Sequence, residues 1–151
     1  MRIQQTNEMG TLTLIRGLPG SGKSTYAKSI LKKERRSSIT GMVHYEADMY
    51  HTKNGIYNYQ ISRAGQAHEW CMNQTRKALE NGKSVIVSNT FSTYGELVAY
   101  IVMAEMLGVK VKIIKCVGEF DSEHDVPEAT IRRMADRWED IDEEEIYNPM
   151  E

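Results

Sequence analysis

Short runs of apolar residues alternate along the chain with longer stretches in which apolar positions recur at helical spacing. The short runs predict four strands, at residues 11–16, 42–46, 84–87 and 109–117. The longer stretches predict helices over residues 24–35, 62–80, 94–107 and 127–139. Strands that alternate with helices form βαβ units, so the pattern predicts a three-layer α/β fold with a mostly parallel four-stranded sheet.

The remaining segments indicate where the chain turns and where it could be divided. Residues 51–59 are polar and aromatic, with two asparagines and a glycine, and predict a loop. Lysines among the apolar residues of 109–117 indicate a strand near an edge of the sheet. No repeat, low-complexity tract or linker divides the sequence, so we expect a single domain over residues 1–151.

Composition narrows the class of protein. Of the 151 residues, 40% are hydrophobic and 26% are charged, which is typical of a globular domain and excludes a disordered or collagen-like chain. No apolar run approaches the roughly 20 residues that cross a bilayer, and the first ten residues lack the apolar core of a signal peptide. Cys71 and Cys116 have neither metal-ligand nor redox spacing. We therefore expect a cytoplasmic protein with reduced thiols and no membrane partner.

The net charge of −2 conceals an uneven distribution. Seven of the 21 acidic residues lie within residues 139–151, which contain no lysine or arginine, so 19 basic residues outnumber 14 acidic ones in the rest of the chain. A mildly basic body suits an anionic substrate. The acidic end from about residue 139 is interpreted as a solvated tail.

One motif directly follows the first predicted strand. Residues 17–25, GLPGSGKST, satisfy the pattern G-x-x-x-x-G-K-[ST] between a strand and a helix, which is the context that a phosphate-binding loop requires. The backbone N–H groups of such a loop and of the following helix bind phosphate oxygens. We predict that Lys23 reaches the β- and γ-phosphates of ATP and that the Ser24 hydroxyl coordinates Mg²⁺. The predicted nucleotide-binding residues are Gly17, Pro19, Gly20, Ser21, Gly22, Lys23, Ser24 and Thr25.

Two acidic residues, Glu46 and Asp48, lie at the end of the second predicted strand. Ligands bind beyond the carboxyl ends of the strands in an open α/β sheet. An acid there can accept a proton from an attacking hydroxyl or hold a metal-bound water. Asp48 is the stronger candidate because it leads into a polar loop, and the alternative is that it only caps the turn. Tyr50, Tyr57 and Tyr59 can stack on a base or simply pack as surface tyrosines.

The strand at residues 84–87 leads into Ser88, Asn89 and Thr90. It resembles the strand that normally delivers a metal-organising aspartate in P-loop proteins, but this chain has no acid there. Asn89 and Thr90 can hydrogen-bond a water on Mg²⁺ but add no charge. We therefore expect metal binding to depend on the nucleotide phosphates, to which Asp48 can add.

Three arginines lie on the last predicted helix, Arg132, Arg133 and Arg137. Arginines of a closing lid neutralise charge on a transferring phosphoryl group, which makes Arg132 and Arg133 candidate catalytic residues. The alternative is a solvated helix face on which Arg133 and Arg137 are neighbours at i, i+4.

Five segments together resemble the small P-loop kinases related to the phage polynucleotide 5′-hydroxyl kinases: GLPGSGKST, EADMY, AHEWC, VIVSNT and HDVPEATIRRM. The resemblance extends from about Leu12 to Trp138. It implies a P-loop kinase fold with a four-stranded parallel sheet, ATP and Mg²⁺ as cofactors, and phosphoryl transfer to a hydroxyl. It also implies that Asp48 is the catalytic aspartate and that Lys23 and Ser24 have the phosphate-loop roles.

The chain departs from this family in two places. The family has an arginine three residues after the catalytic aspartate, which contacts the substrate phosphate, whereas this chain has His51. The family's lid arginine precedes a Val-Pro pair, and residues 118–125 contain no arginine. The expected function is ATP-dependent phosphoryl transfer to the 5′-hydroxyl of a nucleic acid or to a nucleoside-like acceptor. Two alternatives remain open: a nucleotide, nucleoside or other small-molecule kinase, and an NTP-binding ATPase or switch.

Overall fold

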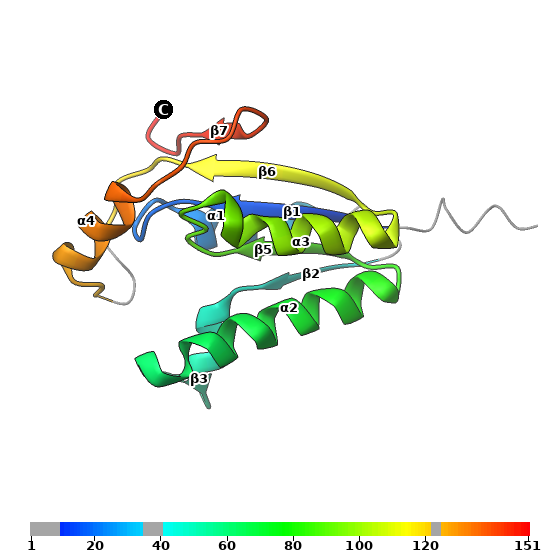
Figure 1. The fold of residues 1–151 in the computed structure, drawn as a ribbon, viewed down its shortest axis with the longest axis horizontal. Coiled ribbons are helices and arrows are strands. Elements are labelled where there is room, and N and C mark those ends of the chain that lie inside the picture. The colour runs from blue at the N-terminus through cyan, green and yellow to red at the C-terminus, as the bar shows by residue number, and fades with distance from the viewer. Residues whose placement is uncertain (1–9, 35–40, 122–124) are drawn as a thin grey trace, which may run out of the picture.

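The computed structural model describes residues 10–34, 41–121 and 125–151 (Figure 1). Its strands are β1 (Thr11–Arg16), β2 (Met42–Tyr45), β3 (Thr52–Lys53), β4 (Ile56–Tyr57), β5 (Ser84–Ser88), β6 (Lys110–Cys116) and β7 (Glu145–Tyr147). Its α-helices are α1 (Lys23–Glu34), α2 (Ala64–Glu80), α3 (Tyr94–Leu107) and α4 (Glu128–Asp136). Two short 3-10 helices are η2 (Ala47–His51) and η3 (Ile61–Arg63). Within these ranges no helix has the length and apolar character needed to cross a membrane.

Five of the strands form one parallel sheet in the order β2-β5-β1-β6-β7. In two of the three interior strands, β1 and β5, every residue after the first is buried. Burial of nearly whole strands is typical of parallel sheets that helices cover on both faces. The predicted three-layer α/β fold with a mostly parallel sheet is confirmed.

Each face of the sheet packs against different helices. Leu14 and Val87 lie in one apolar cluster with residues of α2 and α3. Ile15 and Ile86 lie in a second cluster with Ala27 of α1. Successive residues of a strand point to opposite faces, so the two clusters are the two sides of one sheet, with α3 in front of it and α1 behind it in Figure 1.

The parallel sheet has five strands and not the predicted four. The fifth, β7, lies in the acidic segment and pairs with the end of β6, at Ile114–Cys116. Three residues with one isoleucine carry too little periodicity to predict a strand. The prediction that the strand at 109–117 lies near an edge is confirmed, because only β7 separates β6 from that edge.

Residues 51–59 were expected to be a loop, and that prediction is wrong. β3 and β4 form an antiparallel hairpin there. Its turn consists of Asn54 and Gly55, with φ of 53° and 78°. Positive φ at both central residues defines the type I′ turn, for which Asn-Gly is the strongest sequence signal. The sequence therefore contained the signal for this hairpin.

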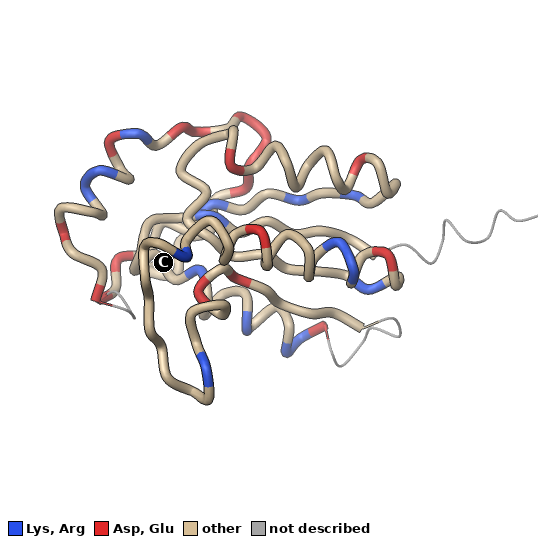
Figure 2. Tube along the Cα trace, turned by 60° about the horizontal axis from the view of Figure 1, so that its bottom comes forward, with Lys and Arg blue, Asp and Glu red and all other residues tan. Residues whose placement is uncertain are grey.

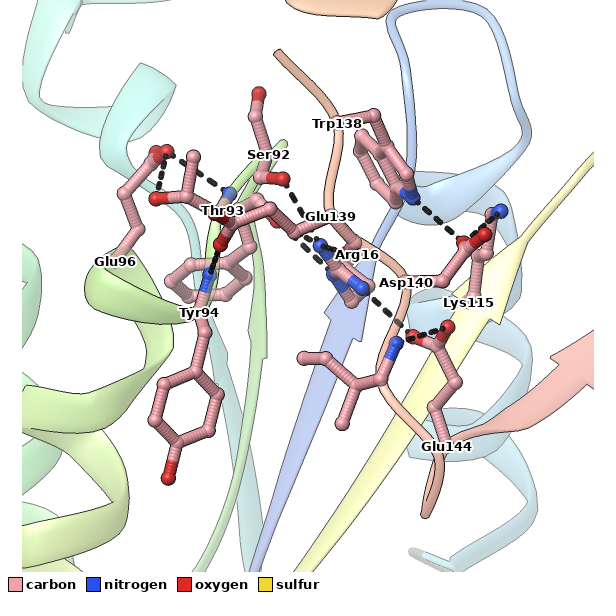
Figure 3. Close-up of polar contacts among 12 residues, drawn as sticks. Arg16, Ser92, Thr93, Tyr94, Glu96, Lys115, Trp138, Glu139, Asp140 and Glu144 are labelled. Carbon is pink, nitrogen blue, oxygen red and sulfur yellow. Dashed lines mark hydrogen bonds and ion pairs between the residues drawn. The ribbon is translucent and has the colours of Figure 1, made fainter.

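The acidic segment after α4 is packed against the body of the protein, which corrects the interpretation as a solvated tail. Figure 2 shows its acidic positions following one another between α4 and β7. Glu144 accepts a hydrogen bond from Arg16 Nη1 at 2.8 Å, and the two side chains are 4% and 0% exposed. Arg16 Nη2 also donates to the carbonyl oxygens of Phe91 and Glu139, at 2.7 and 2.8 Å (Figure 3). The Trp138 ring centre lies 4.1 Å from the guanidinium carbon. A buried cation at the end of β1 needs an opposite charge, and the acidic segment supplies it.

Replacing Glu144 by glutamine should destabilise the protein strongly. The change leaves the Arg16 guanidinium buried without its counter-charge, and breaking a buried ion pair costs about 3–5 kcal/mol. Because Arg16 keeps its hydrogen bonds to carbonyl oxygens, we expect the lower end of that range in the free energy of urea unfolding.

The adjacent residue provides a matched control. Glu145 pairs with Lys112 at 3.5 Å, and both side chains are more than half exposed. Glu145→Gln should therefore cost less than about 1 kcal/mol. Equal losses in the two variants would contradict the importance of the buried pair.

Candidate active site

The predicted phosphate loop connects β1 to α1 at the carboxyl end of the sheet. Gly20 and Gly22 have φ of 84° and 98°, which glycine adopts without strain. At Gly22 an added Cβ would also lie 3.3 Å from the Phe120 ring. The N–H of Phe120 donates to the Gly20 carbonyl oxygen at 2.7 Å. The N–H of Gly118 donates to the Ser21 carbonyl oxygen at 3.0 Å. The segment after β6 thus fixes the shape of the loop.

A cavity of about 1120 Å³ opens beside this loop. Six of the predicted nucleotide-binding residues line it: Pro19, Gly20, Gly22, Lys23, Ser24 and Thr25. The other two, Gly17 and Ser21, are not among its lining residues. The N–H of Gly17 donates to the Thr90 carbonyl oxygen at 3.2 Å, and Ser21 is buried. The loop therefore presents the start of α1 to the cavity.

Lys23 is the first residue of α1 and lines the cavity. Its Nζ donates to the Leu18 carbonyl oxygen of the loop at 3.2 Å. Burial lowers the pKa of Lys23, while the carboxylates of Glu46 and Asp48 raise it. The structure thus brings the lysine of the loop together with both acidic residues that follow β2.

Glu46 directly follows β2 and contacts the phosphate loop. Its Oε2 accepts hydrogen bonds from Ser24 Oγ at 2.8 Å and from Ser88 Oγ at 2.7 Å. The Nε2 atom of His44 lies 3.5 Å from the same oxygen. Burial by itself would raise the pKa of Glu46, but hydrogen bonds from His44, Ser88 and Ser24 outweigh it and lower the pKa to about 2. The carboxylate is therefore ionised at neutral pH.

Asp48 lies on η2 and lines the same cavity. The Tyr57 hydroxyl donates to Asp48 Oδ1 at 3.3 Å. Burial and this carboxylate raise the pKa of Tyr57, so the phenol stays protonated. The Asn89 side chain accepts a hydrogen bond from the Ala47 N–H at 2.9 Å. Asn89, which was expected to bind a metal-bound water, thus holds the turn that carries Asp48.

The two candidate arginines of α4 lie differently. Arg133 lines the cavity and donates to Thr130 Oγ1 at 3.1 Å. Arg132 is not among the lining residues. Its Nη2 lies 3.3 Å from a Glu128 oxygen, and the two side chains are 70% and 87% exposed. The structure therefore brings Arg133, and not Arg132, to the cavity of the phosphate loop.

The oxygen atoms at this site suit Mg²⁺. The Ser24 hydroxyl and the carboxylates of Glu46 and Asp48 are hard donors of the kind that this ion prefers. Among the residues that the structure describes, no three His, Cys, Asp or Glu side chains gather in a metal-binding cluster. An ion would therefore take most of its ligands from nucleotide phosphates and water, as Mg²⁺ does in kinase sites.

Comparison with protein families identifies the family of the chain. The family model described as "AAA domain" matches residues 12–119, which run from β1 to the segment after β6. The chain belongs to the AAA domain family. The matched region contains the phosphate loop, Glu46 and Asp48. It does not reach α4 or β7.

Three known proteins show how far the similarity of this AAA domain extends. Human NEDD4-binding protein 2 is 33% identical over 110 residues, which are 72% of this chain but only 6% of that protein. The Mycobacterium tuberculosis APS kinase CysC in complex with AMPPNP and APS is 16% identical, with a TM-score of 0.68 over 95% of this chain and 90% of that chain. A chain of the Pnkp1/Rnl/Hen1 RNA repair complex is 18% identical, with a TM-score of 0.57 over 89% of this chain and 41% of that chain. The AAA domain therefore has a P-loop kinase fold.

The sequence favoured Asp48 over Glu46, and the structure gives the two acids different surroundings. The strand was expected to include residue 46, but β2 ends at Tyr45. Glu46 is thus the acid that leaves the strand directly, and it is the one that contacts Ser24. Its contact with Ser88 depends on β2 and β5 being neighbours in the sheet, which the sequence alone does not show.

The acidic segment also reaches the cavity, which no sequence signal indicated. Tyr147 of β7 stacks on Tyr26 of α1, with ring centres 3.9 Å apart. Pro149 lines the cavity and packs near Gly22. Tyr147 and Pro149, which lie beyond the region that the family model matches, therefore form part of the wall beside the phosphate loop.

The depressed pKa of Glu46 predicts a specific loss of stability in acid. A folded pKa of about 2, below the usual 4.5, stabilises the folded state above pH 4.5, and this contribution disappears as the pH falls toward 2. Between pH 6 and pH 3 the wild type should therefore lose about 2 kcal/mol more of its unfolding free energy than Glu46→Gln. Urea unfolding at the two pH values measures this difference.

The control for this comparison is Glu105→Gln, on an exposed position of α3. It should reproduce the pH dependence of the wild type. If Glu46→Gln also reproduces it, then Glu46 has an ordinary pKa and the hydrogen-bonded cluster is not formed in solution.

Proposed function

We propose that this AAA domain is an ATP-dependent kinase that transfers the γ-phosphoryl group to a hydroxyl. The observation that carries the proposal is that Lys23 and Asp48 line one cavity. Phosphoryl transfer requires a cation at the phosphates and a residue that orients or deprotonates the attacking hydroxyl. A nucleotide-dependent switch has no need of a proton acceptor at this place, so the pair favours a kinase.

On the donor side, the loop and the N-terminus of α1 would bind the β- and γ-phosphates. Lys23 would neutralise their charge, and the Ser24 hydroxyl would coordinate Mg²⁺. When bound, the ion would supply further positive charge that neutralises the transferring group. Arg133, which lines the cavity, would add a positive charge from α4.

On the acceptor side, we propose the 5′-hydroxyl of a nucleic acid, with Asp48 as the group that accepts its proton. Aromatic side chains surround this end of the cavity. Tyr57 donates to Asp48, and the His51 and Tyr59 ring centres lie 4.8 Å apart. Tyr59 is 48% exposed and lines the cavity. Bases stack on such exposed rings, and the similarity to a chain of the RNA repair complex supports this acceptor.

A small-molecule acceptor is the second candidate, and His51 favours it. In the related polynucleotide kinases an arginine that contacts the substrate phosphate is expected at this position. His51 is 4% exposed, and burial lowers its pKa, so it offers no positive charge at neutral pH. The similarity to an APS kinase whose structure contains APS shows that chains of this fold also act in small-molecule chemistry.

Asp48→Asn should separate a kinase from a switch. The amide is nearly isosteric but cannot accept the proton, so phosphoryl transfer should fall by about 10²- to 10⁴-fold. Binding of AMPPNP should stay close to that of the wild type, and background ATP hydrolysis should fall much less. The measurement uses labelled ATP with 5′-hydroxyl oligonucleotides, nucleosides and nucleotides as acceptors. Full retention of transfer by Asp48→Asn would make Asp48 a turn cap and contradict its catalytic role.

Arg133→Ala and Arg132→Ala form a matched pair on one helix. Arg133 lines the cavity, so its loss should reduce kcat by about 10²- to 10³-fold while nucleotide affinity changes little, since charge on the phosphoryl group shifts in the transition state. Arg132 points to an exposed partner, and its replacement should leave kcat nearly unchanged. The two are compared by steady-state kinetics and by titration with AMPPNP. Equal effects of the two replacements would count against a role for Arg133 at the phosphoryl group.

A further inference from the structure

We propose that Glu46, reaching across from β2, supplies the metal-organising carboxylate that P-loop proteins normally carry at the end of the strand where this chain has Ser88. The inference rests on the proposed nucleotide- and Mg²⁺-dependent function and adds a residue to it. The negative charge that an acid after β5 would provide comes instead from the Glu46 carboxylate, beside β2.

The register of the sheet places the two residues side by side. β2 and β5 are neighbouring parallel strands, and Tyr45 pairs with Val87. The next residues are Glu46, directly after β2, and Ser88, the last residue of β5, and their side chains meet at 2.7 Å. Neighbouring strands lie about 4.8 Å apart, and glutamate is one methylene longer than aspartate. A glutamate on β2 can therefore bring its carboxylate to the place that an aspartate on β5 would occupy.

The hydrogen bond between Ser24 and Glu46 orients the Ser24 hydroxyl. A serine hydroxyl has one hydrogen and two lone pairs. Ser24 donates its hydrogen to Glu46 Oε2 at 2.8 Å, which leaves its lone pairs for a cation. The Glu46 side chain is 18% exposed and lines the cavity, where its carboxylate could accept hydrogen bonds from water bound to the ion.

His44 and Ser88 hold the carboxylate from the other side. His44 Nε2 and Ser88 Oγ lie 2.6 Å apart, and both contact Glu46 Oε2. Partners of this kind fix the orientation of groups around a metal ion, and their loss typically costs about 10- to 100-fold in metal affinity. The Asp48 carboxylate instead accepts a hydrogen bond from the Tyr57 hydroxyl, at 3.3 Å. The two acids thus have separate roles, Glu46 toward the ion and Asp48 toward the acceptor.

The test measures how strongly Mg²⁺ tightens the binding of AMPPNP. Calorimetric titrations are run with excess EDTA and with Mg²⁺ on the full chain and on its variants. In Glu46→Gln we expect the Mg²⁺-dependent gain in affinity to fall by about 10- to 100-fold, while affinity in EDTA stays the same. The exposed control Glu105→Gln should retain the gain. Adding Ser88→Asp to Glu46→Gln should restore much of it, because the charge returns to the same position from β5.

Two results would overturn the assignment. One is a Glu46→Gln variant that keeps the full Mg²⁺-dependent gain. The other is a folded double variant that recovers none of it, which would show that the carboxylate on β2 does not stand in for one on β5. Failure of the kinase proposal has a different signature. Suppose that Glu46→Gln loses the Mg²⁺-dependent gain in AMPPNP affinity and the double variant restores it, but no acceptor is phosphorylated. The assignment of Glu46 is then supported and the proposed phosphoryl transfer is contradicted.

Discussion

The buried guanidinium of Arg16 is the interaction on which the arrangement of this AAA domain depends. Arg16 is the last residue of β1, directly before the phosphate loop, and it is fully buried. An isolated charge in this place would be very costly. Its donors are satisfied by segments that are far apart in the chain, namely the carbonyl oxygens of Phe91 and Glu139 and the carboxylate of Glu144. One cation thus ties the central strand to the turn after β5 and to the segment after α4.

The contacts of Arg16 also position residues that line the cavity. The same segment that neutralises Arg16 continues into β7, which pairs with β6 and brings Tyr147 against Tyr26 of α1. The acidic segment directly follows α4, and Arg133 of α4 lines the cavity. The helix that bears the candidate lid arginine is therefore anchored where the phosphate loop begins. A change in the acidic segment should affect both stability and the cavity wall.

The features that could be predicted from the sequence are those that depend on residues close together in the chain. The phosphate loop follows from its glycines and from the strand and helix around it, and the layered fold follows from alternating strands and helices. Contacts between distant residues could not be predicted. Arg16 and Glu144 are 128 positions apart, and the acidic segment has the composition of a solvated tail. The proposed role of Glu46 depends on β2 lying beside β5 in the sheet, although α2 and the hairpin separate the two strands in the sequence. The Asn54-Gly55 hairpin could have been predicted, because its turn signal stands in the sequence.

The central claim is that the protein transfers the γ-phosphoryl group of ATP to a hydroxyl in the cavity beside the phosphate loop. Phosphorus NMR on the purified full chain tests it directly, with ATP, Mg²⁺ and a set of acceptors that includes 5′-hydroxyl oligonucleotides, nucleosides and sugars. The account predicts that the γ-phosphate signal moves to a phosphomonoester of one acceptor, with ADP formed in equal amount. Conversion of ATP to ADP and inorganic phosphate alone, at the same rate with and without every acceptor, would contradict it.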